Sequence, residues 1–239
     1  MMHMRLSLNR GARTGRQCFF AKMFSPYPKS GHPWNTPDRI PFADFSSRPN
    51  LDQNIMLTTL DFKTALIIID LQKGVVFAPV AAINEVVERA STLAAEFRKY
   101  HLPVVLVNVT GGASGRVELS RGGGQRPEGW TDLIPELNQQ PSDYTISKQT
   151  WGAFMNTGLE KLLKDLEVTQ VVVAGVATSI GVESTARQAY ELGFNVTLAT
   201  DAMADLSPET HENSITRIFP RLGETGTTKQ IIELLSRSR

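Results

Sequence analysis

An acidic and a basic side chain follow two predicted strands and could form a catalytic pair. Asp70 comes directly after the apolar run "ALIII" at 65–69, and Lys148 follows the short extended run "YTIS" at 144–147. A carboxylate beside so apolar a strand is costly to bury unless a cation pairs with it, and Lys148 is the natural partner. Such a pair could perform general acid–base chemistry. On spacing alone, Asp70 could equally cap the next turn.

A glycine turn is the third feature that could do chemistry. The stretch "VVVAGVATSIGVESTARQAYELGF" at 171–194 predicts a buried strand, a tight turn from Gly175 to Gly181 and a helix. The free N–H groups of a helix N-terminus can bind a developing negative charge. In open α/β sheets, ligands bind beyond the carboxyl ends of the strands. We therefore expect Asp70, Lys148 and this turn to lie close together.

The elements that must position these residues alternate along the chain. Short apolar runs at 65–69, 102–109, 171–175 and 196–200 predict strands, and apolar residues at helical spacing between them predict helices. This alternation is typical of an α/β fold with a parallel sheet covered on both faces. Asp201 and Asp205 follow the strand at 196–200 and are expected to cap turns.

The first 55 residues differ in composition from the rest of the chain. They hold six prolines, eight basic and three acidic residues, a net charge of +5, whereas 56–239 hold 17 basic and 21 acidic residues, a net charge of −4. We predict a basic Pro-rich leader at 1–55, disordered or an over-extended start, and one domain at 56–239. A cytoplasmic location is expected, with organellar targeting by the leader as the alternative.

Several classes of partner are disfavoured by composition. A mildly acidic domain is a poor binder of nucleic acid, and no apolar run is long enough to span a membrane. The single cysteine, Cys18, lies in the leader, and the four histidines have no metal-ligand spacing. We therefore expect no metal and no cofactor.

Three segments together resemble the signatures of a known family. The segments "TALIIIDLQKG" (64–74), "ISKQTWGAF" (146–154) and "VVVAGVATSIGVESTARQAYELGFNVTLATDAMAD" (171–205) are similar to those of the isochorismatase-like hydrolases, also called cysteine hydrolases. The resemblance implies a three-layer αβα fold around a mostly parallel sheet of about six strands. It also implies an active site of Asp, Lys and usually Cys, and a homo-oligomer, either a dimer or a tetramer. Asp70 and Lys148 match the first two catalytic positions.

The third catalytic position departs from the commoner family pattern. Amidase members continue the turn as G-V-x-T-x-x-C, and alignment of "GVATSIG" places Gly181 where that cysteine stands. No thiolate can form there. The isochorismatases proper resemble this chain in having glycine at this position, and they hydrolyse an enol ether to pyruvate and a diol without a nucleophilic side chain. They typically read G-V-Y-A-H at the turn, however, so "GVATS" is closer to the amidase branch.

The remaining candidate residues surround this turn. The resemblance implies a non-proline cis peptide before Ala177 that aims backbone N–H groups into the site. Ser179 and Thr178 could replace the nucleophile, although hydrogen bonding within the turn is their more ordinary role. Trp151 could wall the pocket. The further predicted substrate-binding residues are Val176, Phe154 beside Lys148, which could instead be core, and Arg116 in the Gly/Arg-rich loop, which could bind an anion.

The sequence thus predicts a hydrolase that acts without a cysteine nucleophile. Asp70 is the candidate acid and base; burial would raise its pKa and Lys148 would lower it. The resemblance implies a small-molecule substrate, either anionic or an amide, with isochorismate or a related small carboxylate as the candidate. Two alternatives are open: an inactive member that only binds a small molecule or a protein, and an amidase that uses Ser179 in place of the thiol.

Overall fold

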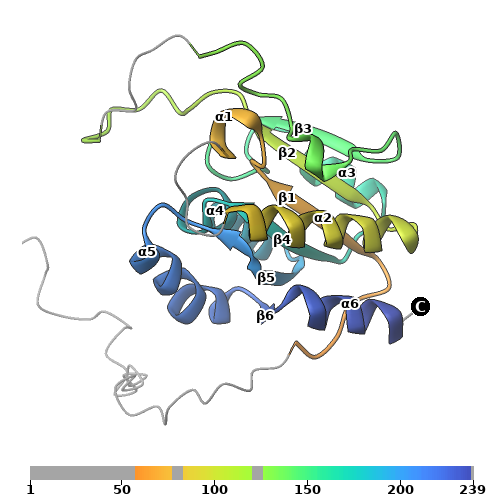
Figure 1. The fold of residues 1–239 in the computed structure, drawn as a ribbon. Helices are drawn as coiled ribbons and strands as arrows, with labels where there is room; N and C mark the ends of the chain where they lie inside the picture. Colours follow the sequence, from red (N-terminus) through yellow and green to blue (C-terminus); the bar gives the residue numbers. More distant parts are fainter. Residues whose placement is uncertain (1–56, 77–82, 120–125, 238–239) are drawn as a thin grey trace, which may run out of the picture. The chain divides into compact units, whose positions relative to one another are not determined.

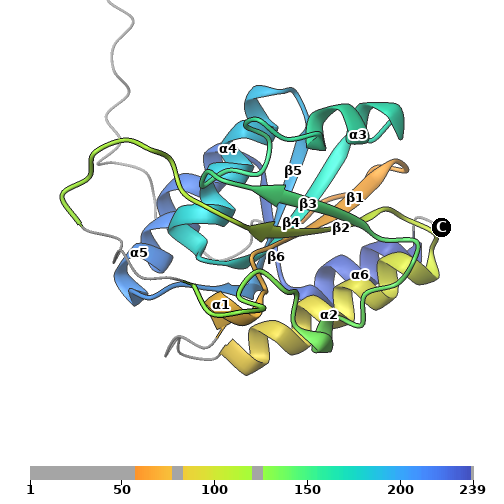
Figure 2. The same ribbon diagram turned by 90° about the horizontal axis from the view of Figure 1, so that it is seen from above.

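In the computed structural model, the described residues are 57–76, 83–119 and 126–237. The predicted leader at 1–55 lies outside them. They form a six-stranded parallel sheet with helices on both faces, as Figures 1 and 2 show from two directions. The three-layer αβα fold predicted from the sequence is confirmed.

The sheet has the strand order β3-β2-β1-β4-β5-β6. The two central strands are buried along their whole length, because helices cover both of their faces. The strands are β1 (Thr64–Ile69), β2 (Val104–Val109), β3 (Tyr144–Lys148), β4 (Gln170–Val176), β5 (Asn195–Ala204) and β6 (Glu224–Gly226).

The helices divide between the two faces of the sheet. Residues of α2 and α6 pack on one apolar cluster, and residues of α3 and α4 pack on the other. The helices are α1 (Lys73–Val76), α2 (Ile83–Lys99), α3 (Leu159–Asp165), α4 (Glu183–Glu191), α5 (Pro208–Asn213) and α6 (Thr228–Arg237). Single turns of 3-10 helix lie at Pro135–Leu137 and Phe219–Arg221, and turns of π-helix at Thr178–Val182 and Ser214–Ile218.

The chain changes direction across the sheet between β1 and β4. From β1 it moves outward to β2 and β3, then returns beside β1 as β4 and continues to β5 and β6. Ligands in open α/β sheets bind at such a switch point. The two strands approach closely here: a Cβ on Gly175, which has φ 113°, would lie 2.1 Å from the carbonyl oxygen of Ile69. Only glycine is compatible with this position.

The strand β5 is longer than the sequence pattern indicates. It runs to Ala204, with a register shift against β4, so Asp201 lies within the strand instead of capping a turn after it. The carboxylate of Asp201 accepts hydrogen bonds from the N–H and hydroxyl of Thr228 at the start of α6. No helix among the described residues has the length and apolar character needed to cross a bilayer.

Candidate active site

The predicted pair of Asp70 and Lys148 is formed at the carboxyl ends of the strands. Asp70 follows β1 with the left-handed φ of 52°, and Lys148 is the last residue of β3. The Nζ atom of Lys148 lies 2.7 Å from Oδ2 of Asp70, and the two residues are only 2% and 7% exposed. Because β2 lies between β1 and β3, the lysine side chain reaches across one strand to make this contact.

The two oxygens of the Asp70 carboxyl have different environments. Oδ2 binds Lys148, whereas Oδ1 is buried and has no hydrogen-bond partner among the described residues. Burial raises the pKa of Asp70 to about 6, because its effect exceeds the lowering by the charge and hydrogen bond of Lys148. A carboxyl with this pKa can both give and take a proton near neutral pH.

The turn after β4 brings Gly181 against this carboxyl. The Val176–Ala177 peptide is cis, as the resemblance implies, and Thr178–Val182 form the π-helical turn that leads into α4. A Cβ on Gly181 would lie 3.3 Å from Oδ2 of Asp70 and 2.9 Å from Cγ2 of Ile69. A side chain at position 181 would therefore adjoin the Asp70 carboxyl, where a nucleophile would have to be.

The N–H groups of this turn are less available than the sequence suggested. The N–H of Ser179 donates to Oδ2 of Asp205 at 2.6 Å, and those of Ile180 and Val182 donate to the carbonyl of Ala177. These three groups cannot bind a substrate oxyanion in this arrangement. The sequence analysis expected free N–H groups at this turn, and these three are not free.

The carboxyl of Asp205 is hydrogen-bonded to the same turn. Partial burial acts to raise the pKa of Asp205, but hydrogen bonds from the backbone and side chain of Ser179 and from the N–H groups of Ser207 and Leu206 outweigh it and leave the pKa lowered. Asp205 is therefore a poor base for activating the Ser179 hydroxyl. The sequence suggested only that Asp205 caps a turn after β5, which it does by accepting from Ser207.

A histidine that the sequence analysis did not place also contacts the turn. The Nδ1 atom of His211, on α5, lies 2.8 Å from the hydroxyl of Thr178, which is fully buried. The hydroxyl of Thr178 is therefore engaged within the protein, and its role in substrate binding stays a prediction. No sequence motif links these two residues, because 33 positions separate them.

The other predicted substrate-binding residues take different places. Phe154 is buried among core residues and packs against Phe194, with ring centroids 6.0 Å apart, which agrees with the core role that the sequence analysis gave as its alternative. Trp151 is half exposed, and Arg116 is exposed on the loop after β2. Their roles in substrate binding stay predictions, as does that of Val176, which is buried at the end of β4.

A polar pocket near the end of β3 was missed by the sequence analysis. It has a volume of about 630 Å³ and is not lined by Asp70 or Lys148, but Thr150, whose carbonyl accepts a hydrogen bond from Lys148 Nζ at 3.2 Å, does line it. Its lining side chains are all uncharged, and the polar ones are those of Thr110, Ser114, Ser147, Gln149, Thr150 and Asn156. Neutral polar residues in a loop carry no sequence signal for binding.

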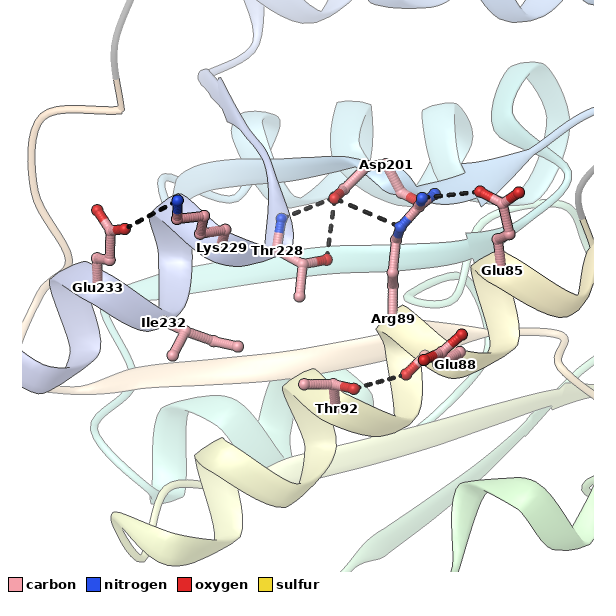
Figure 3. Close-up of a pocket in the computed structure, with 9 residues that line it drawn as sticks. All are labelled: Glu85, Glu88, Arg89, Thr92, Asp201, Thr228, Lys229, Ile232 and Glu233. Carbon is pink, nitrogen blue, oxygen red and sulfur yellow. Dashed lines mark hydrogen bonds and ion pairs between the residues drawn. The ribbon is translucent and has the colours of Figure 1, made fainter.

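A second hollow, shown in Figure 3, is lined mainly by charged side chains. It has a volume of about 590 Å³ and lies between α2 and α6. Acidic residues outnumber basic ones in its lining, and Arg89 pairs with Glu85 at 2.7 Å and with Asp201 at 3.7 Å. Neither Asp70 nor Lys148 lines it. Over the described ranges, no cluster of three or more His, Cys, Asp or Glu residues could hold a metal ion.

Comparison with known proteins decides the family. The family model of the isochorismatase domain matches residues 64–230, which is most of the chain. The chain belongs to the isochorismatase family. It is 44% identical over 188 residues to the uncharacterized isochorismatase family protein YwoC of Bacillus subtilis (strain 168), covering 74% of this chain and 98% of YwoC. Members of this family are hydrolases, and so is this protein.

Two further relatives support the assignment. The uncharacterized isochorismatase family protein YecD of Escherichia coli O157:H7 is 42% identical over 181 residues, covering 72% of this chain and 96% of YecD. The structure of an isochorismatase family protein from Burkholderia thailandensis has a TM-score of 0.72 at 34% identity and covers 74% of this chain and 98% of its own. The likeness therefore extends over nearly the full length of these relatives.

Proposed function

We propose that this isochorismatase-family hydrolase adds water across a bond of a small substrate by acid–base catalysis at Asp70, without a thiol. The observation that carries the proposal is the asymmetry of the carboxyl, with Oδ2 bound to Lys148 and Oδ1 buried and without a partner in the described part of the chain. A buried polar atom in this state calls for a donor, which a water molecule or a substrate group can supply. Gly181 lets the backbone of the turn lie directly against this carboxyl, since a Cβ there would be 3.3 Å from Oδ2 of Asp70.

The first candidate reaction is the hydrolysis of an enol ether of the isochorismate type. Protonated Asp70 gives its proton to the vinyl carbon, and the ether carbon becomes an oxocarbenium ion. Water adds to that carbon and returns a proton to Asp70. The resulting hemiketal then breaks its bond to the ether oxygen, which takes the hydroxyl proton, to give a ketone and an alcohol. Isochorismate itself would give pyruvate and a diol. Lys148 keeps the carboxylate in place between the two proton transfers.

The second candidate is the hydrolysis of an amide, which is supported by the names of relatives that resemble part of the chain. Relatives that match part of the chain include Nicotinamidase 3 of Arabidopsis thaliana, 38% identical over 92 residues, and the ureidoacrylate amidohydrolase RutB of Pantoea ananatis, 36% identical over 78 residues. In this reaction Asp70 would take a proton from the attacking water and pass it to the leaving nitrogen. Ser179 is disfavoured as a nucleophile, since Asp205 holds both its N–H and its hydroxyl.

The pH dependence of kcat/KM separates these two candidates. The pKa of Asp70 is raised to about 6. If the carboxylic acid must protonate the substrate first, kcat/KM falls as the pH rises above about 6. If the carboxylate must first take a proton from water, kcat/KM rises through about pH 6 to a plateau. In either case the inflection disappears in the Asp70→Asn variant.

The decisive experiment is a turnover assay on a substrate panel. Purified protein is given isochorismate with coupled detection of pyruvate, and in parallel a set of small amides with detection of ammonia. We expect turnover of at least one of them, and no inhibition by iodoacetamide, because the chain's one cysteine lies at position 18 in the predicted leader. Full activity of Asp70→Asn would refute the mechanism. Saturable binding without any turnover would favour an inactive binding member instead.

Assembly and location belong to the same proposal. We propose a homo-oligomer, a dimer or tetramer, acting on a small molecule in the cytoplasm and not on nucleic acid or a membrane. Light scattering on the purified protein tests the first statement. Fractionation of cells that express the whole chain tests the second, because a leader that directs transport would place the protein in an organelle.

A further inference from the structure

The segment that follows β5 makes three polar contacts with the turn that carries Gly181. We name residues 205–214 the clamp segment. Oδ2 of Asp205 accepts the N–H of Ser179 at 2.6 Å. The other two contacts are those of His211 Nδ1 with the hydroxyl of Thr178 at 2.8 Å, and of the Ser214 hydroxyl, which donates to Oε2 of Glu183 at 2.6 Å.

These contacts hold the turn on both sides of Gly181. Thr178 and Ser179 precede the glycine, and Glu183 follows it at the start of α4. The hydroxyls of Thr178 and Ser214 belong to fully buried residues, so water cannot replace a lost protein partner there. Loss of a contact from the clamp segment would therefore leave a buried polar group of this turn unpaired.

The position of the turn matters because Gly181 has no side chain with which to hold itself against Asp70. A Cβ at position 181 would be only 3.3 Å from Oδ2 of Asp70, so the space beside the carboxyl is set by where the backbone of the turn lies. In a catalytic site, a misplacement of about 1 Å can cost about 100-fold in rate. Small movements of the turn are therefore expected to change turnover more than they change the fold.

We propose that His211 is a positioning residue for hydrolysis: it acts through Thr178 to fix the turn that carries Gly181 at its distance from Asp70. The inference rests on the proposed function. His211 contacts neither Asp70 nor Lys148 and takes no part in the proton transfers. Its imidazole supplies one hydrogen bond to a buried hydroxyl, which either neutral tautomer can make as donor or as acceptor.

This chemistry provides both a disruptive and a conservative substitution. His211→Leu keeps much of the side-chain volume but removes the hydrogen bond. His211→Asn keeps a polar group at about the position of Nδ1, and an amide can act as donor or acceptor toward Thr178. Thr178→Val removes the other partner and is nearly isosteric with threonine. The matched control is Thr216→Val, whose hydroxyl bonds only to the backbone carbonyl of Glu212 on the exposed side of the same region.

The experiment measures kcat and KM for the full chain carrying each substitution, with melting temperature as the stability readout. His211→Leu is expected to lower kcat by about 10- to 100-fold while KM changes by less than about 3-fold. His211→Asn is expected to recover most of that loss. The double variant of Thr178→Val and His211→Leu is expected to be no worse than either single variant, because both remove the same interaction. Thr216→Val should leave kcat unchanged.

Hydrogen exchange of the peptide that spans 177–187 tests the clamp without any substrate. The amides of the turn are expected to exchange about 10-fold faster in His211→Leu than in wild type, and at the wild-type rate in His211→Asn and Thr216→Val. Unchanged exchange in His211→Leu would overturn the inference. Wild-type kcat in an active His211→Leu variant with a lowered melting temperature would do the same, because it would show a purely structural role. A wild-type protein that turns over no substrate would count against the proposed function alone, since the exchange data would still decide the clamp.

Discussion

The buried pair of Asp70 and Lys148 allows stability and catalysis to be separated by substitution. Asp70→Asn removes the negative charge beside an ammonium group that is 2.7 Å away and only 2% exposed. Breaking a buried ion pair from one side can cost about 3–5 kcal/mol, because the remaining charge is left without compensation. The raised pKa of Asp70 opposes this, because it means that burying the carboxylate costs more than Lys148 returns, so a neutral side chain at position 70 avoids that cost at pH 7. An asparagine oxygen can also accept a hydrogen bond from Nζ, so we expect Asp70→Asn to be at least as stable as wild type at pH 7, with a gain of up to about 3 kcal/mol.

A second substitution removes the charge that is left behind. Methionine fits the path of the lysine stem, since it is unbranched, flexible and apolar. Replacing a whole buried pair by apolar or neutral groups is often neutral or stabilising, so adding Lys148→Met to Asp70→Asn should leave the free energy of unfolding at or above that of Asp70→Asn. Activity should stay about 10²- to 10⁴-fold lower in both variants, because the acid–base group is absent.

Urea denaturation at pH 7 followed by circular dichroism measures the stability of each variant, and turnover is measured on the same samples. The matched control is Asp165→Asn, which breaks the exposed pair with Lys161, where the side chains are 60% and 80% exposed. Such surface pairs contribute about 0–1 kcal/mol. A double variant less stable than Asp70→Asn alone would refute the account of the pair. Wild-type turnover in Asp70→Asn would refute its catalytic role.

Three further changes test other parts of the site. Burial raises the pKa of Asp70 from 3.8 to about 6, so the native state keeps this proton to a higher pH than the unfolded chain does. The free energy of unfolding should therefore fall by about 3 kcal/mol as the pH rises from about 4 to above 6. Denaturation curves measured across this range should show the fall in wild type and not in Asp70→Asn. Gly181→Ala places a Cβ 2.9 Å from Cγ2 of Ile69, so it should cost about 1–3 kcal/mol in thermal unfolding and lower kcat/KM; unchanged values would contradict the close approach. Gly175→Ala should prevent folding, visible as loss of soluble protein, because its Cβ would lie 2.1 Å from a backbone oxygen of β1 at a φ of 113°.

The sheet and the catalytic pair were predictable from local patterns. Continuous apolar runs such as "ALIII" indicate strands covered on both faces. Ligands bind at the carboxyl ends of parallel strands, and this rule predicts that Asp70 and Lys148 lie close together. The strand order was not predictable. Nothing in the residues after β2 indicates that β3 lies at an edge, with its lysine reaching across β2 to the centre.

The clamp segment shows what the sequence alone could not provide. A serine followed by proline at 207–208 is a typical helix start, and the Ser207 side chain does cap α5. The spacing of His211 and Ser214 places them on one side of the helical region that follows. The surface that this side faces depends on how α5 packs after β5, which no local pattern encodes. The sequence likewise left two roles open for Phe154, because an aromatic residue beside a catalytic lysine suits a core as well as a pocket.

The place of Lys148 on a strand with a single neighbour has a consequence for how the protein loses activity. β3 pairs only with β2, and three of its five residues are partly or fully buried while the other two face outward. Edge elements with few buried contacts open at lower free energy than central ones. Gentle heating should therefore detach this strand, and with it the cation of the site, while most of the sheet is still intact. Activity would then be lost at a lower temperature than the one at which the circular dichroism signal declines.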